Sequence, residues 1–140
     1  MKLRRDFDLL PEDARFLEEY GLPWETVADG SQWVLVHQFP SQHEGYNHST
    51  VTIAIRLETG YPNTELNMVY VHPALARKDR RPIGATEAKQ TISGTVYQRW
   101  SRHRTAQNPW SPTQDGIGSH IFLIEDWFVR EFEKCPQTQT

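Results

Sequence analysis

A helical period of apolar positions appears near each end of the chain. Residues 10–21 place Phe16, Leu17 and Tyr20 on one face, with proline at the start and glycine just after the end, which is typical of a short helix. Near the other end, Ser119 can cap a second helix whose apolar stripe should pack on a sheet. That stripe consists of Ile121, Ile124, Phe128 and Phe132, widened by Phe122, Trp127 and Val129.

The middle of the chain shows the pattern of β-strands. Residues 33–39 are rich in β-branched and aromatic side chains, residues 51–57 alternate between apolar and polar, and residues 66–71 form a third such run. The breaks between these segments are short, so we expect an antiparallel meander of about four strands. Residues 74–95 predict a long basic loop, whereas residues 95–103 fit a helix and a strand equally and stay unassigned.

These patterns predict an α+β fold. The chain has 140 residues, a length that fits one domain, and no internal repeat is visible. We therefore expect a single domain over residues 1–140, with a core at about 8–134 and a frayed polar tail at 135–140. Sixteen aromatic residues, five of them tryptophan, can supply most of the buried surface.

The composition excludes several classes of site. A single cysteine, Cys135, rules out an intramolecular disulfide and any Cys-x-x-Cys zinc or redox motif, and it favours a reducing cytoplasm. No apolar run reaches the roughly 20 residues that span a bilayer, and the first residues lack the apolar stretch of a signal peptide. Nucleotide-binding glycine motifs are missing, and the histidines lack the spacing of metal ligands. These histidines are His37, His43, His48, His72, His103 and His120.

The net charge of −3 conceals an asymmetry. Residues 77–104 carry a net charge of +6, and the rest of the chain carries −9. Such a split indicates either a polar partner for the basic segment or a solvated loop. Aromatic side chains among arginines could also stack on nucleic-acid bases, although a buried aromatic beside surface arginines is the plainer interpretation. The residues concerned are Tyr97, Arg99, Trp100, Arg102 and Arg104.

Four motifs occur in an order that resembles the core of ubiquitin-conjugating enzymes. The alternating strand at 51–57 is followed by a Tyr-Pro turn, then by a strand that ends in His-Pro, and finally by Trp-Ser-Pro before the apolar helix. More narrowly, the chain resembles the prokaryotic ubiquitin-conjugating family E. The structural motif residues are Tyr61, Pro62, Pro73, Trp110, Ser111 and Pro112.

This resemblance implies a fold and a set of partners. The implied fold has a first helix, a four-stranded antiparallel meander and a helix that follows Trp-Ser-Pro. Compared with the family, we expect the usual final helices to be missing. The implied partners are a ubiquitin-like protein and an activating enzyme, with a deubiquitinase-type metalloprotease from the same system as a further candidate. No metal or organic cofactor is implied, and antiphage defence is the implied biological setting.

The chain departs from the family at the residues that carry the chemistry. His72-Pro73 is followed by Ala74, so the asparagine that would stabilise an oxyanion is absent; loss of one such donor costs on the order of 10² to 10³ in rate. The family cysteine lies about eight residues before the tryptophan of Trp-Ser-Pro, and that position here is Arg102. Cys135 matches no motif residue.

Two functional hypotheses remain from these departures. In the first, Ser101 carries the modifier's acyl group as an oxyester, with His103 as base or direct acyl acceptor and His72 as a third catalytic candidate. In the second, the chain is a non-catalytic module that binds the modifier or the activating enzyme, and His72 is structural. The arginines expected to contact partners are Arg77, Arg80, Arg99, Arg102 and Arg104.

Overall fold

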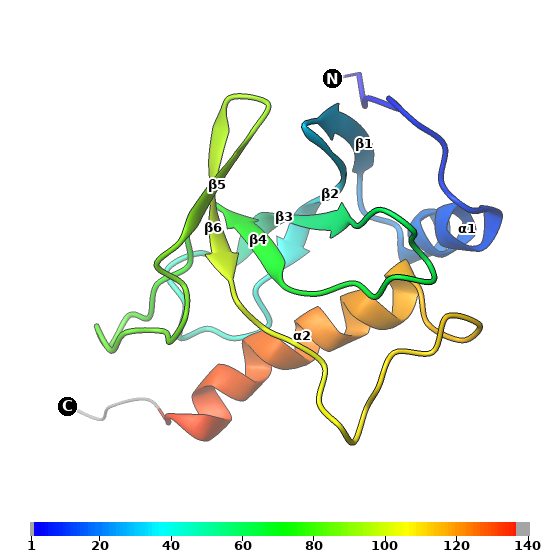
Figure 1. Ribbon diagram of the computed structural model, residues 1–140. Helices are drawn as coiled ribbons and strands as arrows, with labels where there is room; N and C mark the ends of the chain where they lie inside the picture. The colour runs from blue at the N-terminus through cyan, green and yellow to red at the C-terminus, as the bar shows by residue number, and fades with distance from the viewer. Residues whose placement is uncertain (1, 137–140) are drawn as a thin grey trace.

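The computed structural model describes residues 2–136, which form two helices and one antiparallel sheet of six strands (Figure 1). The sheet has the order β1-β2-β3-β4-β6-β5. This confirms the predicted α+β class and both helices, but the expected number of four strands is wrong. The elements are α1 (Pro11–Tyr20), β1 (Trp24–Asp29), β2 (Ser31–Pro40), β3 (Thr50–Leu57), β4 (Val69–His72), β5 (Lys89–Ile92), β6 (Thr95–Trp100) and α2 (Ile117–Lys134).

Two hairpins account for the additional strands. β1 pairs with β2 through a tight turn at Gly30, whose φ of 71° suits glycine. β5 pairs with β6 across Ser93 and Gly94, which both have positive φ, as a two-residue hairpin turn requires. The second hairpin lies inside the segment predicted to be a long loop, so that prediction is wrong for residues 89–95.

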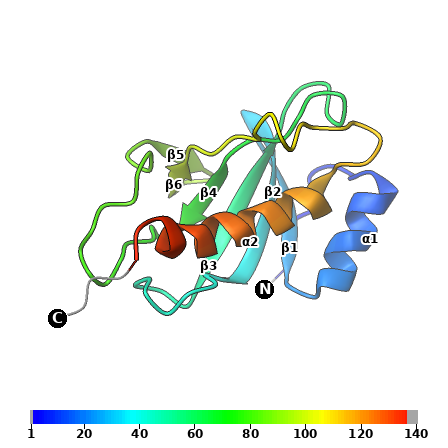
Figure 2. The same ribbon diagram turned by 90° about the horizontal axis from the view of Figure 1, so that it is seen from below.

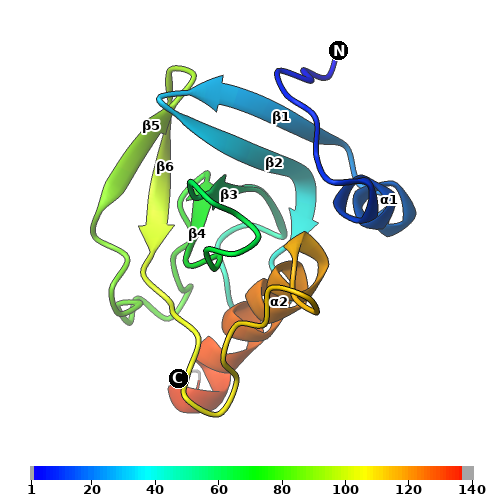
Figure 3. The same ribbon diagram turned by 45° about the vertical axis from the view of Figure 1, so that its right-hand side comes forward.

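The sheet curls until its two end hairpins meet. Figure 3 shows the β1–β2 hairpin and the β5–β6 hairpin on two sides of the central strands β3 and β4. The tips touch directly, because the Ser93 N–H donates a 2.7 Å hydrogen bond to Asp29 Oδ2. The curled inner face encloses a small apolar cluster made of Val27, Trp33, Leu35, Ala54, Tyr70, Ile92 and Tyr97.

The main core lies between the other face of the sheet and α2, which crosses it (Figure 2). The predicted stripe of α2 is buried as expected at Ile121, Ile124, Phe128 and Phe132. Phe122 differs, because it is 55% exposed and packs edge-on against Phe16 of α1. The helix also begins earlier than expected. Gly116 is its N-cap. Ser119 is the third residue of the helix, and its Oγ accepts a 3.1 Å hydrogen bond from the Gly116 N–H.

The first helix has the ends that the sequence predicts. Pro11 is its first residue, and Gly21 ends it in the left-handed conformation with a φ of 90°. Leu17 is buried, and Phe16 packs edge-on against Phe122 of α2. The Tyr20 hydroxyl also donates a hydrogen bond to Glu125, so α1 and the first half of α2 form one layer.

Candidate functional site

A groove of about 280 Å³ lies between α2 and the segment that follows β6. We call it the α2 groove. Its lining combines apolar surface from Leu123 and Trp127 with charged side chains of both signs. The lining residues are Arg102, His103, Arg104, Thr105, Asn108, Leu123, Asp126, Trp127, Arg130, Glu131 and Lys134.

Backbone contacts position the segment that forms one wall of this groove. The Met68 N–H donates to the Arg102 carbonyl oxygen at 2.9 Å, which continues the pairing of β4 with β6 beyond the sheet. The Ser101 N–H donates to the Ala85 carbonyl oxygen at 3.0 Å on the other side. Trp100 just before this segment is fully buried, so the wall begins at a fixed point of the core.

Arg102 occupies the position expected for the family cysteine, and its guanidinium is held in place. The group lies 4.8 Å from the centre of the Trp100 ring and donates to the Gly84 carbonyl oxygen at 3.0 Å. Glu131 of α2 lies 3.9 Å away. Burial lowers the pKa of Arg102, and the Glu131 carboxylate opposes that shift. Arg102 therefore joins the two walls of the groove.

Arg104 forms the second fixed cation of the groove. Its guanidinium lies 3.3 Å from Asp115 and 5.0 Å from the centre of the Trp110 ring, with a side chain only 5% exposed. Burial opposes ionisation of Asp115, but hydrogen bonds from Ser111 and Ser119 and the Arg104 charge hold the pKa of that carboxyl below its usual value. The predicted partner-binding role of Arg104 thus concerns a side chain already paired within the protein.

The three candidate catalytic residues do not converge. Ser101 is half-buried beside the groove, and within residues 2–136 its hydroxyl has no hydrogen-bond partner. His103 is exposed, lines the groove and places its Nδ1 3.4 Å from Asn67 Oδ1, not at Ser101. His72 lies elsewhere, because Val69 pairs with Trp100 in the β4–β6 ladder and His72 is three residues further along β4. Its Nδ1 lies 3.1 Å from the Val96 carbonyl oxygen.

The other predicted partner-binding arginines lie outside the groove. The Arg77 side chain is 0% exposed and is held by Asp79, Glu131 and the Cys135 carbonyl oxygen. A surface role for Arg77 is therefore wrong, since its guanidinium is a buried structural contact. Arg99 is half-buried and belongs to the sheet face opposite α2, because it alternates with Trp100, whereas Arg80 is exposed in the loop after β4.

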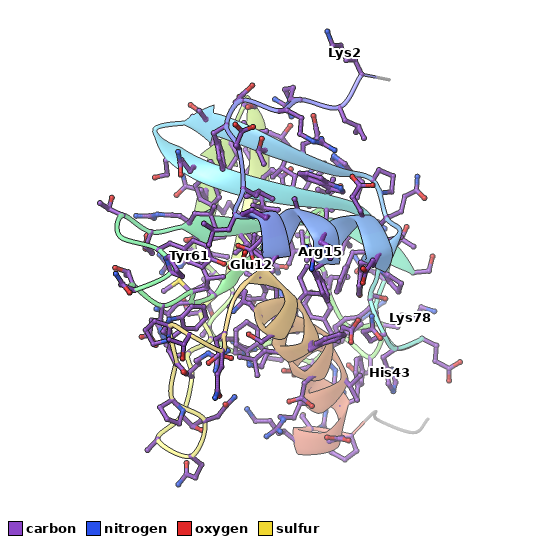
Figure 4. The ribbon with its side chains drawn as sticks, turned by 90° about the vertical axis from the view of Figure 1, so that its right-hand side faces the viewer. Lys2, Glu12, Arg15, His43, Tyr61 and Lys78 are labelled. Carbon is purple, nitrogen blue, oxygen red and sulfur yellow. The ribbon has the colours of Figure 1, made fainter. Side chains whose placement is uncertain are left out.

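Two of the family motifs, Tyr-Pro and Trp-Ser-Pro, pack against each other at the start of α2. The Trp110 Nε1–H donates to the Pro62 carbonyl oxygen at 2.8 Å, and the Tyr61 hydroxyl donates to Asp13 Oδ2 at 2.6 Å. Figure 4 shows Tyr61 beside the first turn of α1, near Glu12. Both Tyr61-Pro62 and His72-Pro73 have cis peptide bonds, and the Ser111 N–H donates to Asp115 at 2.8 Å. Tyr-Pro and Trp-Ser-Pro therefore form one structural unit; Pro112 lines the adjacent hollow.

Sequence reasoning did not find the wall of the groove that α2 contributes. Asp126, Arg130 and Lys134 follow the polar side of the helix at helical spacing, which was the available signal. Within residues 2–136, no group of three His, Cys, Asp or Glu side chains is arranged to hold a metal ion. The helices in this part of the chain are also too short or too polar to cross a membrane.

The order of elements and the packing of the motif residues define a ubiquitin-conjugating-like protein. The chain belongs to prokaryotic E2 family E, whose family model matches residues 9–131. A search of curated proteins and of solved structures found no significant match. Membership of this family assigns the chain to the conjugation of ubiquitin-like proteins, which involves a ubiquitin-like modifier and an activating enzyme.

Proposed function

We propose that the α2 groove binds the carboxyl-terminal tail of a ubiquitin-like protein, so that the chain receives the modifier from an activating enzyme and presents it for transfer. The observation that carries this proposal is the position of the groove. One of its walls begins at Arg102, the position at which the family motifs place the acyl-carrying residue, directly after Ser101. A deubiquitinase-type metalloprotease is a further proposed component of the same system.

The charge and shape of the groove support an extended tail with a terminal carboxylate. Arg102, Arg104, Arg130 and Lys134 outnumber the two acidic side chains that line the groove, which leaves a net charge of +2. Because Arg102 and Arg104 are paired with carboxylates of the protein, Arg130 and Lys134 are the exposed cations that a ligand would meet. Trp127 and Leu123 provide apolar surface for the body of the tail. Arg130 has a 58% exposed side chain, so it remains accessible to a ligand despite its ion pair with Asp126.

The test measures the binding of a panel of prokaryotic ubiquitin-like proteins to this chain. Each protein is prepared in two forms, one intact and one without its carboxyl-terminal tail. We expect only intact proteins to bind, and the double variant Arg130→Glu, Lys134→Glu to weaken binding about tenfold, since two reversed exposed charges change the binding free energy by roughly 1–2 kcal/mol. The matched control reverses Lys2 and Lys89, two exposed lysines outside the groove. Equal binding of tailless proteins, or no binding by any member of the panel, would contradict the proposal.

A covalent role for Ser101 is the second candidate, because within the described residues its hydroxyl has no hydrogen-bond partner and the next residue, Arg102, lines the groove. In that reaction, Ser101 Oγ attacks the terminal carbonyl of the modifier and displaces the activating enzyme's thiolate. The serine proton passes to that thiolate, directly or through His103. The product is an oxyester, which Ser101→Ala should abolish and hydroxylamine should cleave.

Incubation with activating enzyme, ATP and modifier distinguishes the covalent role from the non-catalytic one. An alkali-labile adduct on Ser101 supports an acyl carrier. Reversible binding that persists in the double variant Ser101→Ala, His103→Ala supports a non-catalytic binding module. If that variant is folded and loses all binding, the non-catalytic function is wrong.

Nucleic-acid binding has less support, because three arginines of the basic segment are already paired. Arg77, Arg102 and Arg104 each lie within 4 Å of a carboxylate in the protein. Proteins that bind nucleic acid through phosphate contacts lose affinity steeply as salt rises. We therefore expect no salt-sensitive gel shift with single- or double-stranded DNA.

A further inference from the structure

Three polar side chains from neighbouring strands form a connected chain on the sheet face opposite α2. Glu25 of β1 places its Oε1 2.8 Å from His37 Nε2, and His37 of β2 places its Nδ1 3.0 Å from Thr52 Oγ1 of β3. Behind the carboxylate, Arg4 Nε lies 2.8 Å from Glu25 Oε2. The sequence separates these residues widely, and only the pairing of the strands brings them together.

The partners determine the direction of each hydrogen bond. Hydrogen bonds from Arg4 keep Glu25 ionised, with a pKa of about 2. An ionised carboxylate only accepts, so His37 Nε2 carries the proton and donates it toward Glu25. In the neutral imidazole, Nδ1 then holds a lone pair and accepts from the Thr52 hydroxyl. The Thr52 proton therefore points at a base that a buried carboxylate orients.

Local backbone geometry supports a role beyond sheet stability. The β2–β3 register shifts between Val36 and Phe39, so His37 lies in a β-bulge, next to Gln38 with a φ of 57°. A bulge of this kind redirects a side chain, and a positive φ at a non-glycine residue costs free energy. Here the bulge brings the His37 ring to Thr52 on the adjacent strand.

Thr52 is only partly buried, and a second imidazole lies on the neighbouring strand beside it. Glu25 is 5% exposed and His37 25% exposed at their side chains, while Thr52 is half-buried. His72 pairs directly with Thr52 in the β3–β4 ladder, which places their β-carbons about 5 Å apart. His72 donates its Nδ1–H to the Val96 carbonyl oxygen, so its Nε2 is available to a bound group.

We infer that Glu25, His37 and Thr52 form a second reactive site, which transfers acyl groups from activated esters and thioesters to the Thr52 hydroxyl. Thr52 Oγ1 attacks the acyl carbonyl carbon while its proton passes to His37 Nδ1. The bond from the carbonyl to the leaving alkoxide or thiolate breaks, and His37 returns the proton to that leaving group. The product is an acyl ester on Thr52. Glu25 acts as a positioning residue that keeps the His37 proton on Nε2.

This site is independent of the proposed function. The α2 groove and Thr52 lie on opposite faces of the sheet, because Thr52 alternates with the core residues Val51 and Ile53 that face α2. Ser101 lacks a comparable base, since His103 Nδ1 is directed at Asn67. Acylation of Thr52 therefore neither requires nor excludes binding of a ligand in the α2 groove.

The test uses p-nitrophenyl acetate as the probe, with intact-mass and peptide-mass analysis of the whole chain. We expect a single acetyl group on Thr52, formed with release of p-nitrophenolate, and retained in Ser101→Ala. Thr52→Val should abolish it, and Thr52→Ser should restore it. His37→Gln should slow acetylation about a hundredfold, within the usual range for loss of a general base. Thr50→Val is the matched control, because Thr50 is exposed on the same strand and face.

A second measurement separates catalysis from loss of structure. Nitrogen-15 NMR of the His37 ring should show the Nε2–H tautomer in the wild type and a mixture of tautomers in Glu25→Gln, with slower acetylation and an unchanged circular dichroism spectrum. Acetylation of Thr50 and Thr52 at equal rates, labelling confined to lysines, or an Nδ1–H tautomer at His37 in the wild type would overturn the inference.

Discussion

The Arg77 guanidinium donates a 2.6 Å hydrogen bond to the carbonyl oxygen of Cys135, which ties the loop after β4 to the end of α2. The same guanidinium contacts Asp79 and Glu131 and lies 4.4 Å from the centre of the Phe132 ring. This contact joins the basic segment to the helix that forms one wall of the α2 groove. It also places Cys135 in an ordered contact, whereas the sequence predicted a frayed tail from this residue onward; residues 137–140 lie outside the described part.

Replacement of Arg77 by methionine should destabilise the protein strongly. The variant removes the buried guanidinium that contacts both Asp79 and Glu131, and breaking a buried ion pair typically costs about 3–5 kcal/mol. Urea unfolding followed by tryptophan fluorescence measures the change. Arg80→Met is the control, because Arg80 is exposed and should change the free energy of unfolding by less than about 0.5 kcal/mol. Similar losses in both variants would show that burial of Arg77 is unimportant.

Replacement of Gly118 by alanine should destabilise α2, although alanine usually favours a helix by about 1 kcal/mol. A β-carbon at Gly118 would lie 2.8 Å from Phe16 Cδ2 and would force α1 away from α2. We expect a net loss of about 1–3 kcal/mol from this overpacking, measured by thermal unfolding. Gly84→Ala is the control, since a β-carbon there meets nothing within 4 Å. A rise in stability for Gly118→Ala would contradict the close packing.

Removal of the Tyr61 hydroxyl should weaken the unit that holds the start of α2. Tyr61 donates to Asp13, which is buried and also accepts the Ile117 N–H at 3.3 Å. Tyr61→Phe should cost about 1–3 kcal/mol, because a buried carboxylate loses a donor. Burial raises the pKa of Asp13, so its contribution to stability falls as pH rises through that raised pKa. The cost of Tyr61→Phe should therefore be larger at pH 7 than at pH 4.

His120 should make the protein sensitive to mild acid. Burial lowers the pKa of His120 to about 4, and its Nε2 donates to the Met68 carbonyl oxygen at 2.8 Å. The folded state protonates His120 less readily than the unfolded state does. The contribution of neutral His120 to stability is therefore complete above the unfolded-state pKa of about 6.5 and is lost as the pH falls from there through the folded-state pKa of about 4. The loss should be on the order of 3 kcal/mol. Urea midpoints between pH 7 and pH 4 test this, and His120→Gln should flatten the profile.

Local patterns explain which parts of the fold the sequence predicted. The strand residues 51–57 and the α2 stripe were correct because their periods reflect which face is buried. β1 was missed because Glu25 and Thr26 are buried polar residues that disturb the apolar pattern. The β5–β6 hairpin was missed because its short strands are mostly polar on the exposed side and β5 forms the edge of the sheet.

The candidate sites depended on contacts that no local pattern contains. The β4–β6 register separated His72 from Ser101, and the fold buried Arg77 between α2 and the loop after β4. The chain of Glu25, His37 and Thr52 required three strands and a bulge to be in place. By itself, the sequence determined the family motifs, both helices and the central strands, since these follow from short-range periodicity. Only the tertiary structure decided which charges are paired and which hydroxyl faces a base, because both depend on how distant strands align.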